Sequence, residues 1–280
     1  AITQLFAENA GWSPELGDVG TWLGAQAGRL KAISLQADAL MADYGMAVAV
    51  SRLPWQATIA ITFVIFPMVS EATFAEDRAR TQLYIRQTMR YSMILVGAAV
   101  VVLVAVPDAV FRVLPEGYQG GAIALAWLAP AYFSFSLFNI VNTLLMSSGR
   151  AGTALAVGLL TIVIIIGLYA YVLPMADSSD TLLVYAGATT LCGFSVGLGL
   201  GGIALWRLYG PPIPIGTLIR VVLVGAAITV AGRMVPELGR FASLFVAGVA
   251  GVAFLVGMVI SGEFGAEDKE RLRRILTKGN

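Results

Sequence analysis

Long stretches without any charged residue constrain this chain more than any other feature. They are the segments 53–70, 91–107, 117–149, 151–176, 181–206 and 241–262. The last four are longer than the roughly 20 residues that a helix needs to cross the hydrocarbon core of a bilayer. Only 12% of the residues are charged, whereas a soluble domain has about 25%. The chain is therefore expected to be an integral membrane protein.

The uncharged segments and their flanks predict an all-α, polytopic transmembrane bundle of about seven helices. A further apolar segment near 214–235 contains Arg220 toward one end. The period-2 alternation of membrane barrels is absent from these segments. The expected helices are 44–70, 89–107, 121–146, 152–173, 181–206, 214–235 and 240–261.

Basic residues between the expected spans predict the orientation. When alternate loops are grouped, twelve Lys and Arg residues fall on one side and five on the other, and Arg52 lies within a span. The twelve include the four arginines of the expected loop after the first span, Arg78, Arg80, Arg86 and Arg90. Because Lys and Arg are enriched in cytoplasmic loops, we expect a cytoplasmic C-terminus in a bacterial inner membrane.

Seven spans then place the N-terminus outside the membrane. No signal peptide precedes the first span, and the first residue is Ala. We therefore expect a fragment that lacks an upstream half. A complete seven-helix protein is the alternative.

Composition excludes several classes of site. The chain has no His and one Cys, so a His-based zinc site, a Ser-His-Asp triad and a disulfide framework are not expected. The net charge of +1 gives no footprint for nucleic acid. A phosphate-binding Gly loop is also absent, so neither a cofactor nor catalysis is expected. No Asp or Glu lies in the spans, which argues against proton coupling there.

The expected organisation has four parts. Residues 1–43 form an extracytoplasmic helical segment that begins a helix at Ser13-Pro14-Glu15. Residues 44–206 form a bundle of five spans, and 207–261 add two more. Residues 262–280 form a cytoplasmic basic tail, either attracted to anionic lipid or simply solvated.

Arg52 is the exceptional charge, because it falls inside the first span with Pro54 and Gln56 close by. A buried Arg in a membrane faces water, finds a partner or extends to the interface. One interpretation is an anion contact, in which the guanidinium holds a phosphate. The other is an Arg that extends to the outer surface.

The third span carries the most polar side chains, in a helix interrupted by Pro130. These side chains recur at helical spacing and should face other helices or a cavity. They either bind sugar hydroxyls or form hydrogen bonds between helices. They are Tyr132, Ser136, Asn139, Asn142 and Thr143.

Small residues mark the fifth span. Gly193, Gly197 and Gly201 repeat every four residues, which predicts close helix packing. Cys192 is expected to be a small packed hydrophobic residue. The segment 111–118, between the second and third spans, is expected to lie in the membrane interface.

Short motifs in order along 44–173 resemble the C-terminal half of the oligosaccharide flippases. These belong to the multidrug/oligosaccharidyl-lipid/polysaccharide exporter superfamily, which includes the Wzx-type O-antigen flippases and MurJ. The motifs are YGMAVAVSRLP at 44–54, FPMVS at 66–70, RQTMRY at 86–91, GY at 117–118, and FNIVNTLL with SGR at 138–150.

The resemblance implies a fourteen-helix transporter whose first lobe is missing from this chain. It implies alternating access, with a polyprenyl-diphosphate-linked glycan as substrate and the lipid bilayer around its tail. The cavity candidates are Arg52, Gln56, Tyr132, Ser136, Asn139 and Asn142. The alternatives are a drug/cation antiporter of the same superfamily and a membrane enzyme acting on polyprenyl-phosphate sugars.

Overall fold

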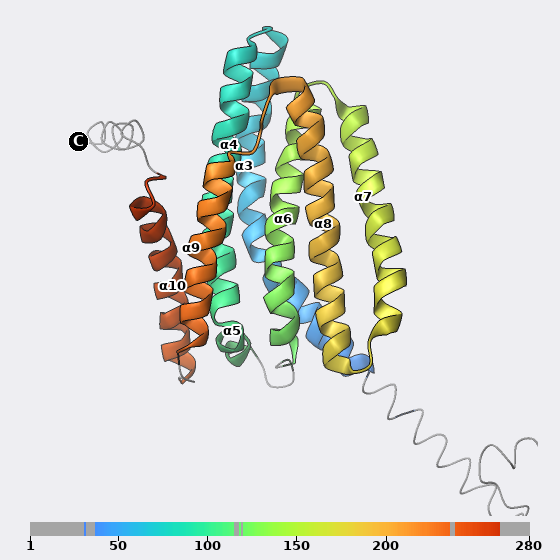
Figure 1. Ribbon diagram of the computed structural model, residues 1–280, viewed down its shortest axis with the longest axis vertical. Helices are drawn as coiled ribbons and strands as arrows, with labels where there is room; N and C mark the ends of the chain where they lie inside the picture. Colours follow the sequence, from blue (N-terminus) through green and yellow to red (C-terminus); the bar gives the residue numbers. More distant parts are fainter. Residues whose placement is uncertain (1–30, 32–36, 115–117, 119, 236–238, 264–280) are drawn as a thin grey trace, which may run out of the picture. The chain divides into compact units, whose positions relative to one another are not determined.

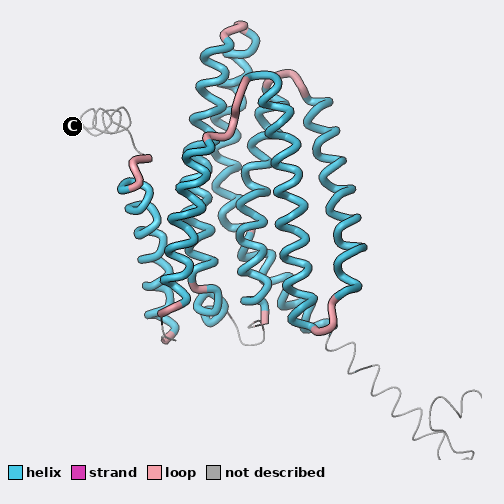
Figure 2. Tube along the Cα trace, viewed as in Figure 1, coloured by secondary structure: helices cyan, strands magenta, loops and turns pink. Residues whose placement is uncertain are grey.

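The fold is described from a computed structural model, which places residues 31, 37–114, 118, 120–235 and 239–263. The chain divides into two compact units, Ala1–Ala42 and Asp43–Asn280. In the second unit, the described residues form helices and short connections, without a strand (Figure 2). The expected helix start at 13–15 and the basic tail at 266–278 lie outside the described residues.

Long antiparallel helices make up this second unit (Figure 1). Within this unit, helical residues 43–51 lead into the first labelled helix. The helices are α3 (Leu53–Phe74), α4 (Arg78–Ala105), α5 (Pro107–Val113), α6 (Gly121–Ser147), α7 (Ala151–Val172), α8 (Ser179–Tyr209), α9 (Ile215–Arg233) and α10 (Arg240–Ile260), with a short 3-10 turn η1 (Leu173–Met175) after α7.

Six of the described helical segments are long and apolar enough to cross a membrane. They are Ala37–Phe74, Arg78–Ala105, Gly121–Ser147, Ala151–Met175, Ser179–Tyr209 and Ile215–Arg233. A shorter apolar stretch, Phe245–Ile260, lies in α10. The protein is therefore a multi-pass helical membrane protein, and a count of seven spans stays a prediction.

The expected boundary of the second span is wrong by about three turns. The arginines assigned to a loop instead lie in the first turns of α4, and only residues 75–77 separate this helix from α3. Asp77 caps α4 by accepting a hydrogen bond from the Arg80 backbone N–H, at 3.0 Å. Arg78 donates to the carbonyl of Leu208 at the end of α8, at 3.0 Å. Arginine has a high helix propensity. A group of charged residues therefore did not indicate that the helix had not yet begun.

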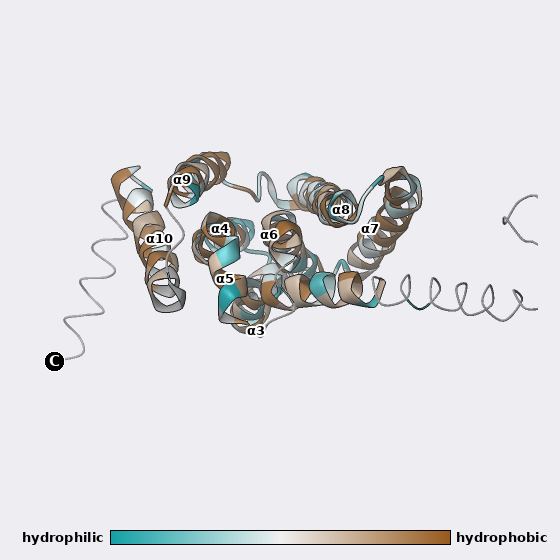
Figure 3. Cartoon of the chain, turned by 90° about the horizontal axis from the view of Figure 1, so that it is seen from below, coloured by the Kyte–Doolittle hydropathy of each residue, from teal (hydrophilic) through white to brown (hydrophobic). Residues whose placement is uncertain are grey.

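The helices differ in how much of their surface the bundle buries. In the most apolar windows of α4 and α6, 61% and 67% of residues are buried, against 11% in α7 and 17% in α9. Seen along the helices, α4 and α6 lie in the middle of the group (Figure 3). Met89 and Met93 of α4 pack there with Leu137 and Leu144 of α6. The outer faces of α7 and α9 are left for lipid or another protein surface.

The glycines of α8 confirm the predicted packing face. A Cβ on Gly193 would lie 2.2 Å from Ile165, and one on Gly197 would lie 2.6 Å from Thr161, both in α7. A Cβ on Gly201 would lie 2.8 Å from Val141 of α6. Helix backbones can approach so closely only where side chains are absent.

One smaller expectation is corrected. Cys192 is exposed rather than packed. Successive residues of a helix point in different directions, so the side chain of Cys192 lies outside the packed face to which Gly193 belongs. The segment 107–113 forms the short helix α5, and its Phe111 is buried. Pro at the first helical positions suits such a start, since its missing N–H would have no intrahelical partner. That the segment 111–118 lies in the membrane interface stays a prediction.

Candidate functional site

Arg52 lies at a break between two helical segments. Residues 37–51 are helical, Arg52 is a turn residue, and α3 begins at Leu53 with Pro54 in its first turn. Backbone hydrogen bonds continue across the break, from Arg52 N to Val48 O at 3.1 Å and from Gln56 N to Arg52 O at 3.3 Å. Pro54 has no N–H to donate, which bends helices, and Figure 1 shows the bend at the lower part of α3.

Arg52 is joined to one of the predicted polar side chains of α6. Its Nε donates a hydrogen bond to the Tyr132 hydroxyl at 3.0 Å. The structure describes no other hydrogen bond and no carboxylate partner for this guanidinium, and the side chain is exposed. Arg52 thus places a fixed positive charge at the protein surface. The guanidinium N–H groups that Tyr132 does not use can donate hydrogen bonds to an acceptor.

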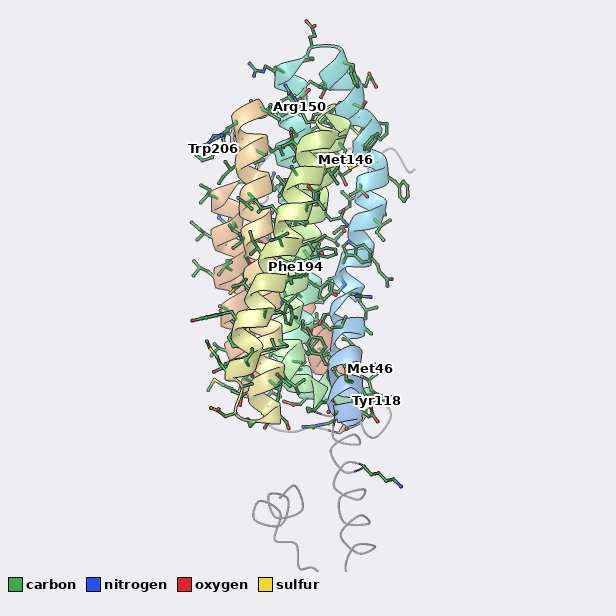
Figure 4. All side chains as sticks on the ribbon, turned by 90° about the vertical axis from the view of Figure 1, so that its right-hand side faces the viewer. Met46, Tyr118, Met146, Arg150, Phe194 and Trp206 are labelled. Carbon is green, nitrogen blue, oxygen red and sulfur yellow. The ribbon has the colours of Figure 1, made fainter. Side chains whose placement is uncertain are left out.

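Aromatic side chains from three helices gather beside Arg52. We call Trp55, Tyr132, Phe135 and Phe194 the aromatic cluster. Phe135 lies 5.6 Å from Trp55, 5.7 Å from Tyr132 and 4.7 Å from Phe194, measured between ring centroids. Each separation suits an attractive ring contact. Phe194 lies near the middle of the helices, between Met146 toward one end and Met46 toward the other (Figure 4).

The remaining cavity candidates are spread over different environments. Gln56 is exposed one turn beyond Arg52. Ser136 is fully buried and donates to the Tyr132 carbonyl of its own helix, at 2.7 Å. Asn139 is half-buried, and its carbonyl accepts a hydrogen bond from Thr143 at 3.0 Å.

Asn142 lies apart from the Arg52 region. It lines a cavity of about 360 Å³ between α6 and α7, together with Met146, Leu155 and Leu159. Its Oδ1 is buried and has no hydrogen-bond partner in the structure. The six candidates therefore do not form one site: Arg52 and Tyr132 are in contact, whereas Asn142 faces a separate, mostly apolar cavity.

A tyrosine bridge connects the first helical segment to α7 and α8. The hydroxyls of Tyr44 and Tyr169 lie 2.9 Å apart. The Tyr169 hydroxyl also lies 2.6 Å from Thr190 Oγ1 and donates to the Ala186 carbonyl at 3.1 Å. Tyr44 precedes Arg52 by about 12 Å of helix. The bridge thus links α7 and α8 to the helical segment that ends just before Arg52.

A second charged group, the Glu263 cluster, lies just beyond α10. We define it as Glu263, Arg90, Arg220 and Thr217. Glu263 Oε1 accepts from Arg90 Nε at 2.7 Å and from Thr217 Oγ1 at 2.6 Å, while Oε2 accepts from Arg220 Nη1 at 2.6 Å. Arg90 also donates to the Glu263 main-chain carbonyl.

The Glu263 carboxyl is only 2% exposed. Burial by itself would raise its pKa, but the hydrogen bonds from Thr217, Arg220 and Arg90, with the charge of Arg90, outweigh it and leave the pKa below its ordinary value. The carboxylate therefore stays ionised and ties α10 to α4 and α9. All its oxygens are occupied by the protein, so this cluster is a structural anchor.

Sequence reasoning missed the aromatic cluster and the Glu263 cluster. Tyr132 and Phe135 are three residues apart, a spacing that places side chains on one helix face, so half of the aromatic cluster was detectable. Trp55 and Phe194 come from other helices and had no local signal. Glu263 was assigned to the tail, because a single acid after an apolar segment looks like a solvated end.

Comparisons with known proteins give no match. No family model, no curated protein and no solved structure matches this chain.

Proposed function

We propose that this chain is part of a flippase that moves a lipid-linked oligosaccharide or polysaccharide precursor across the bacterial inner membrane. The mechanism is alternating access, in which helices move around the substrate and no covalent bond changes. The resemblance of residues 44–173 to the exporter superfamily gives the substrate class. The multi-pass helical bundle suits such a role.

The contact between Arg52 and Tyr132 carries the proposal. A guanidinium is planar and binds phosphate oxygens through two parallel hydrogen bonds. Only Nε of Arg52 is used by Tyr132, so the outer nitrogens can address a diphosphate. Tyr132 fixes the direction of the guanidinium and, as a neutral partner, leaves its charge intact.

The aromatic cluster supports a ligand with an extended apolar or ring surface beside that charge. Binding sites combine such apolar walls with a few oriented polar groups. A cation would be repelled by Arg52, and this favours the glycolipid over the drug/cation antiporter. The proposed route keeps the diphosphate at Arg52 while the polyprenyl tail stays in the bilayer.

A second helical lobe is part of the proposal, as the superfamily resemblance implies. Exposed apolar side chains on α3 and α7 leave surface that such a lobe could cover, among them Phe63 at 76% and Val163 at 65% exposure. Alternating access would then change how the two lobes meet. We propose that the C-terminus is cytoplasmic, on the side of the twelve basic residues.

Transport by the full-length protein with Arg52→Ala tests this function. The expected result is normal membrane insertion and at least a tenfold loss of glycolipid translocation, because a charge-assisted contact is worth about 1.5–3 kcal/mol. Translocation is measured in inverted or right-side-out vesicles, as the fraction of a labelled lipid-linked glycan that becomes accessible at their outer face.

Arg52→Lys and Arg150→Ala serve as matched variants. Lys keeps the charge and loses the planar fork, so an intermediate rate is expected. Arg150 lies exposed between α6 and α7, and its loss should leave transport unchanged. Wild-type rates in Arg52→Ala would contradict the proposal.

A further inference from the structure

A cavity of about 410 Å³ lies at one end of the bundle, away from the aromatic cluster. It is formed where α4 ends, α5 follows, α6 begins, and α9 and α10 meet. In Figure 3, α4, α5, α9 and α10 lie on one side of α6, and α7 lies on the other side. Its volume falls in the range of small-molecule sites, about 300–1,000 Å³.

Charged and apolar side chains share the lining of this cavity. Arg112 of α5 and Arg233 of α9 bring two positive charges, and Asp108 brings one negative charge. The remaining wall includes the aliphatic side chains of Ala109, Ala126 and Val246. Among the lining residues that the structure describes, two arginines and one aspartate leave one positive charge in excess beside an apolar surface, which suits an anionic group attached to an apolar body.

The cavity lies at the level where the apolar helices end. Arg233 is the last residue of α9, and α4 ends at Ala105. The polar headgroup layer of a bilayer adjoins the hydrocarbon core at this depth. Arginines at such a boundary meet lipid phosphates, and the guanidinium binds them bidentately.

The wall between α4 and α9 is formed by tight packing. A Cβ on Gly232 would lie 2.7 Å from the Ala105 carbonyl oxygen, so the two backbones are in direct contact there. Arg233, the next residue, is held at the cavity by this contact. The positive group is therefore positioned by backbone packing, which favours a defined ligand over loose charge attraction.

We propose that this cavity binds the headgroup phosphate of a bilayer phospholipid, with the first part of its acyl chains against the apolar wall. Arg112 and Arg233 hold the phosphate oxygens. The site uses none of the Arg52 contacts, and it would exist whether or not the chain transports a glycolipid.

Native mass spectrometry of the delipidated 280-residue chain in detergent tests the site. Phosphatidylglycerol is titrated, with diacylglycerol as a ligand that lacks the phosphate. The double variant Arg112→Gln/Arg233→Gln should bind phosphatidylglycerol about tenfold or more weakly than wild type. Diacylglycerol should bind wild type as weakly as phosphatidylglycerol binds the double variant.

Two further variants separate the site from general charge and from misfolding. Arg150→Gln/Arg207→Gln removes two arginines from the opposite end and should bind like wild type. Ala126→Phe keeps both arginines but fills the cavity, and it should also lose binding while its helical circular dichroism stays unchanged.

Three results would overturn the proposal. The first is equal phosphatidylglycerol binding by wild type and the Arg112→Gln/Arg233→Gln variant. The second is equal binding of diacylglycerol, which would make the cavity merely apolar. The third is displacement of the lipid by millimolar inorganic phosphate, which would make it a site for a small anion.

Discussion

Arg52 and Glu263 are charged residues in very different surroundings. Arg52 is exposed, and a neutral tyrosine is its one described partner. Glu263 is buried, and two arginines and a threonine satisfy its oxygens. A buried charge is tolerated only when paired and hydrogen-bonded. Glu263 therefore serves stability, whereas Arg52 keeps hydrogen-bond donors that Tyr132 does not use.

Replacing Glu263 by Gln should lower the stability of the purified protein by about 2 kcal/mol. Loss of one partner of a fully buried pair costs about 3–5 kcal/mol, and the effect is smaller here because the Arg220 side chain is 42% exposed. Thermal unfolding in detergent at pH 7 measures the change.

The matched control is Glu71→Gln. Glu71 lies 3.7 Å from Arg80, and their side chains are 72% and 47% exposed. Exposed ion pairs contribute about 0–1 kcal/mol, so the midpoint should hardly move. Similar losses in both variants would show that the Glu263 cluster is no anchor.

The pH dependence of stability arises from the same carboxylate. Its pKa in the folded protein is lowered from 4.5, so its contribution is fully present above that value and is lost as the pH falls through the folded pKa. Wild type should lose its advantage over Glu263→Gln below about pH 4.5. A difference that persisted unchanged to pH 2 would contradict this assignment. Paired thermal melts between pH 2 and pH 7 give the measurement.

At the scale of elements, the glycine face of α8 determines how closely α6 and α7 approach it. The four-residue spacing of these glycines was visible in the sequence. The structure adds which neighbouring helix each glycine contacts. The start of α4 could not be predicted in this way. Its arginines were expected in a loop, but they lie in the helix. Helix propensity and the Asp77 cap extend α4 beyond its apolar part.

Gly197→Ala should destabilise the bundle, and Gly199→Ala should not. A Cβ at Gly197 would lie 2.6 Å from Thr161, whereas one at Gly199 has no neighbour within 4 Å. Overpacking costs about 1–3 kcal/mol, while Gly→Ala in an open helix position gains up to about 1 kcal/mol. Thermal unfolding of the two variants, which differ by two positions in one helix, measures the contrast. Equal midpoints would show that α7 can shift to admit a methyl group.

At the scale of the whole molecule, the ends of the helices divide into two groups. The connections 75–77 and 148–150 lie at one end, and 176–178 lies at the other, as the antiparallel order requires. Which end faces the cytoplasm is predicted by the basic residues alone.

Single-cysteine labelling should establish the orientation. In a Cys192→Ser background, Asp177→Cys should react with a membrane-impermeant maleimide on intact cells. Ala151→Cys, exposed at the start of α7, should react only after permeabilisation. The reverse pattern would place the twelve basic residues outside and remove the basis for a cytoplasmic C-terminus.

The sequence by itself determined the class of protein and most helix positions. A span is a local property, since it needs only enough consecutive apolar residues to match the bilayer. The expected spans 121–146 and 214–235 accordingly differ by one or two residues from Gly121–Ser147 and Ile215–Arg233.

Only the tertiary structure decided which side chains meet. Arg52 and Tyr132 are 80 residues apart, and Arg90 and Glu263 are 173 apart. Such partners depend on which helices pack together and how each is rotated, and apolar residues on every face of a membrane helix leave that rotation unspecified. The site and the anchor both arise from packing between helices.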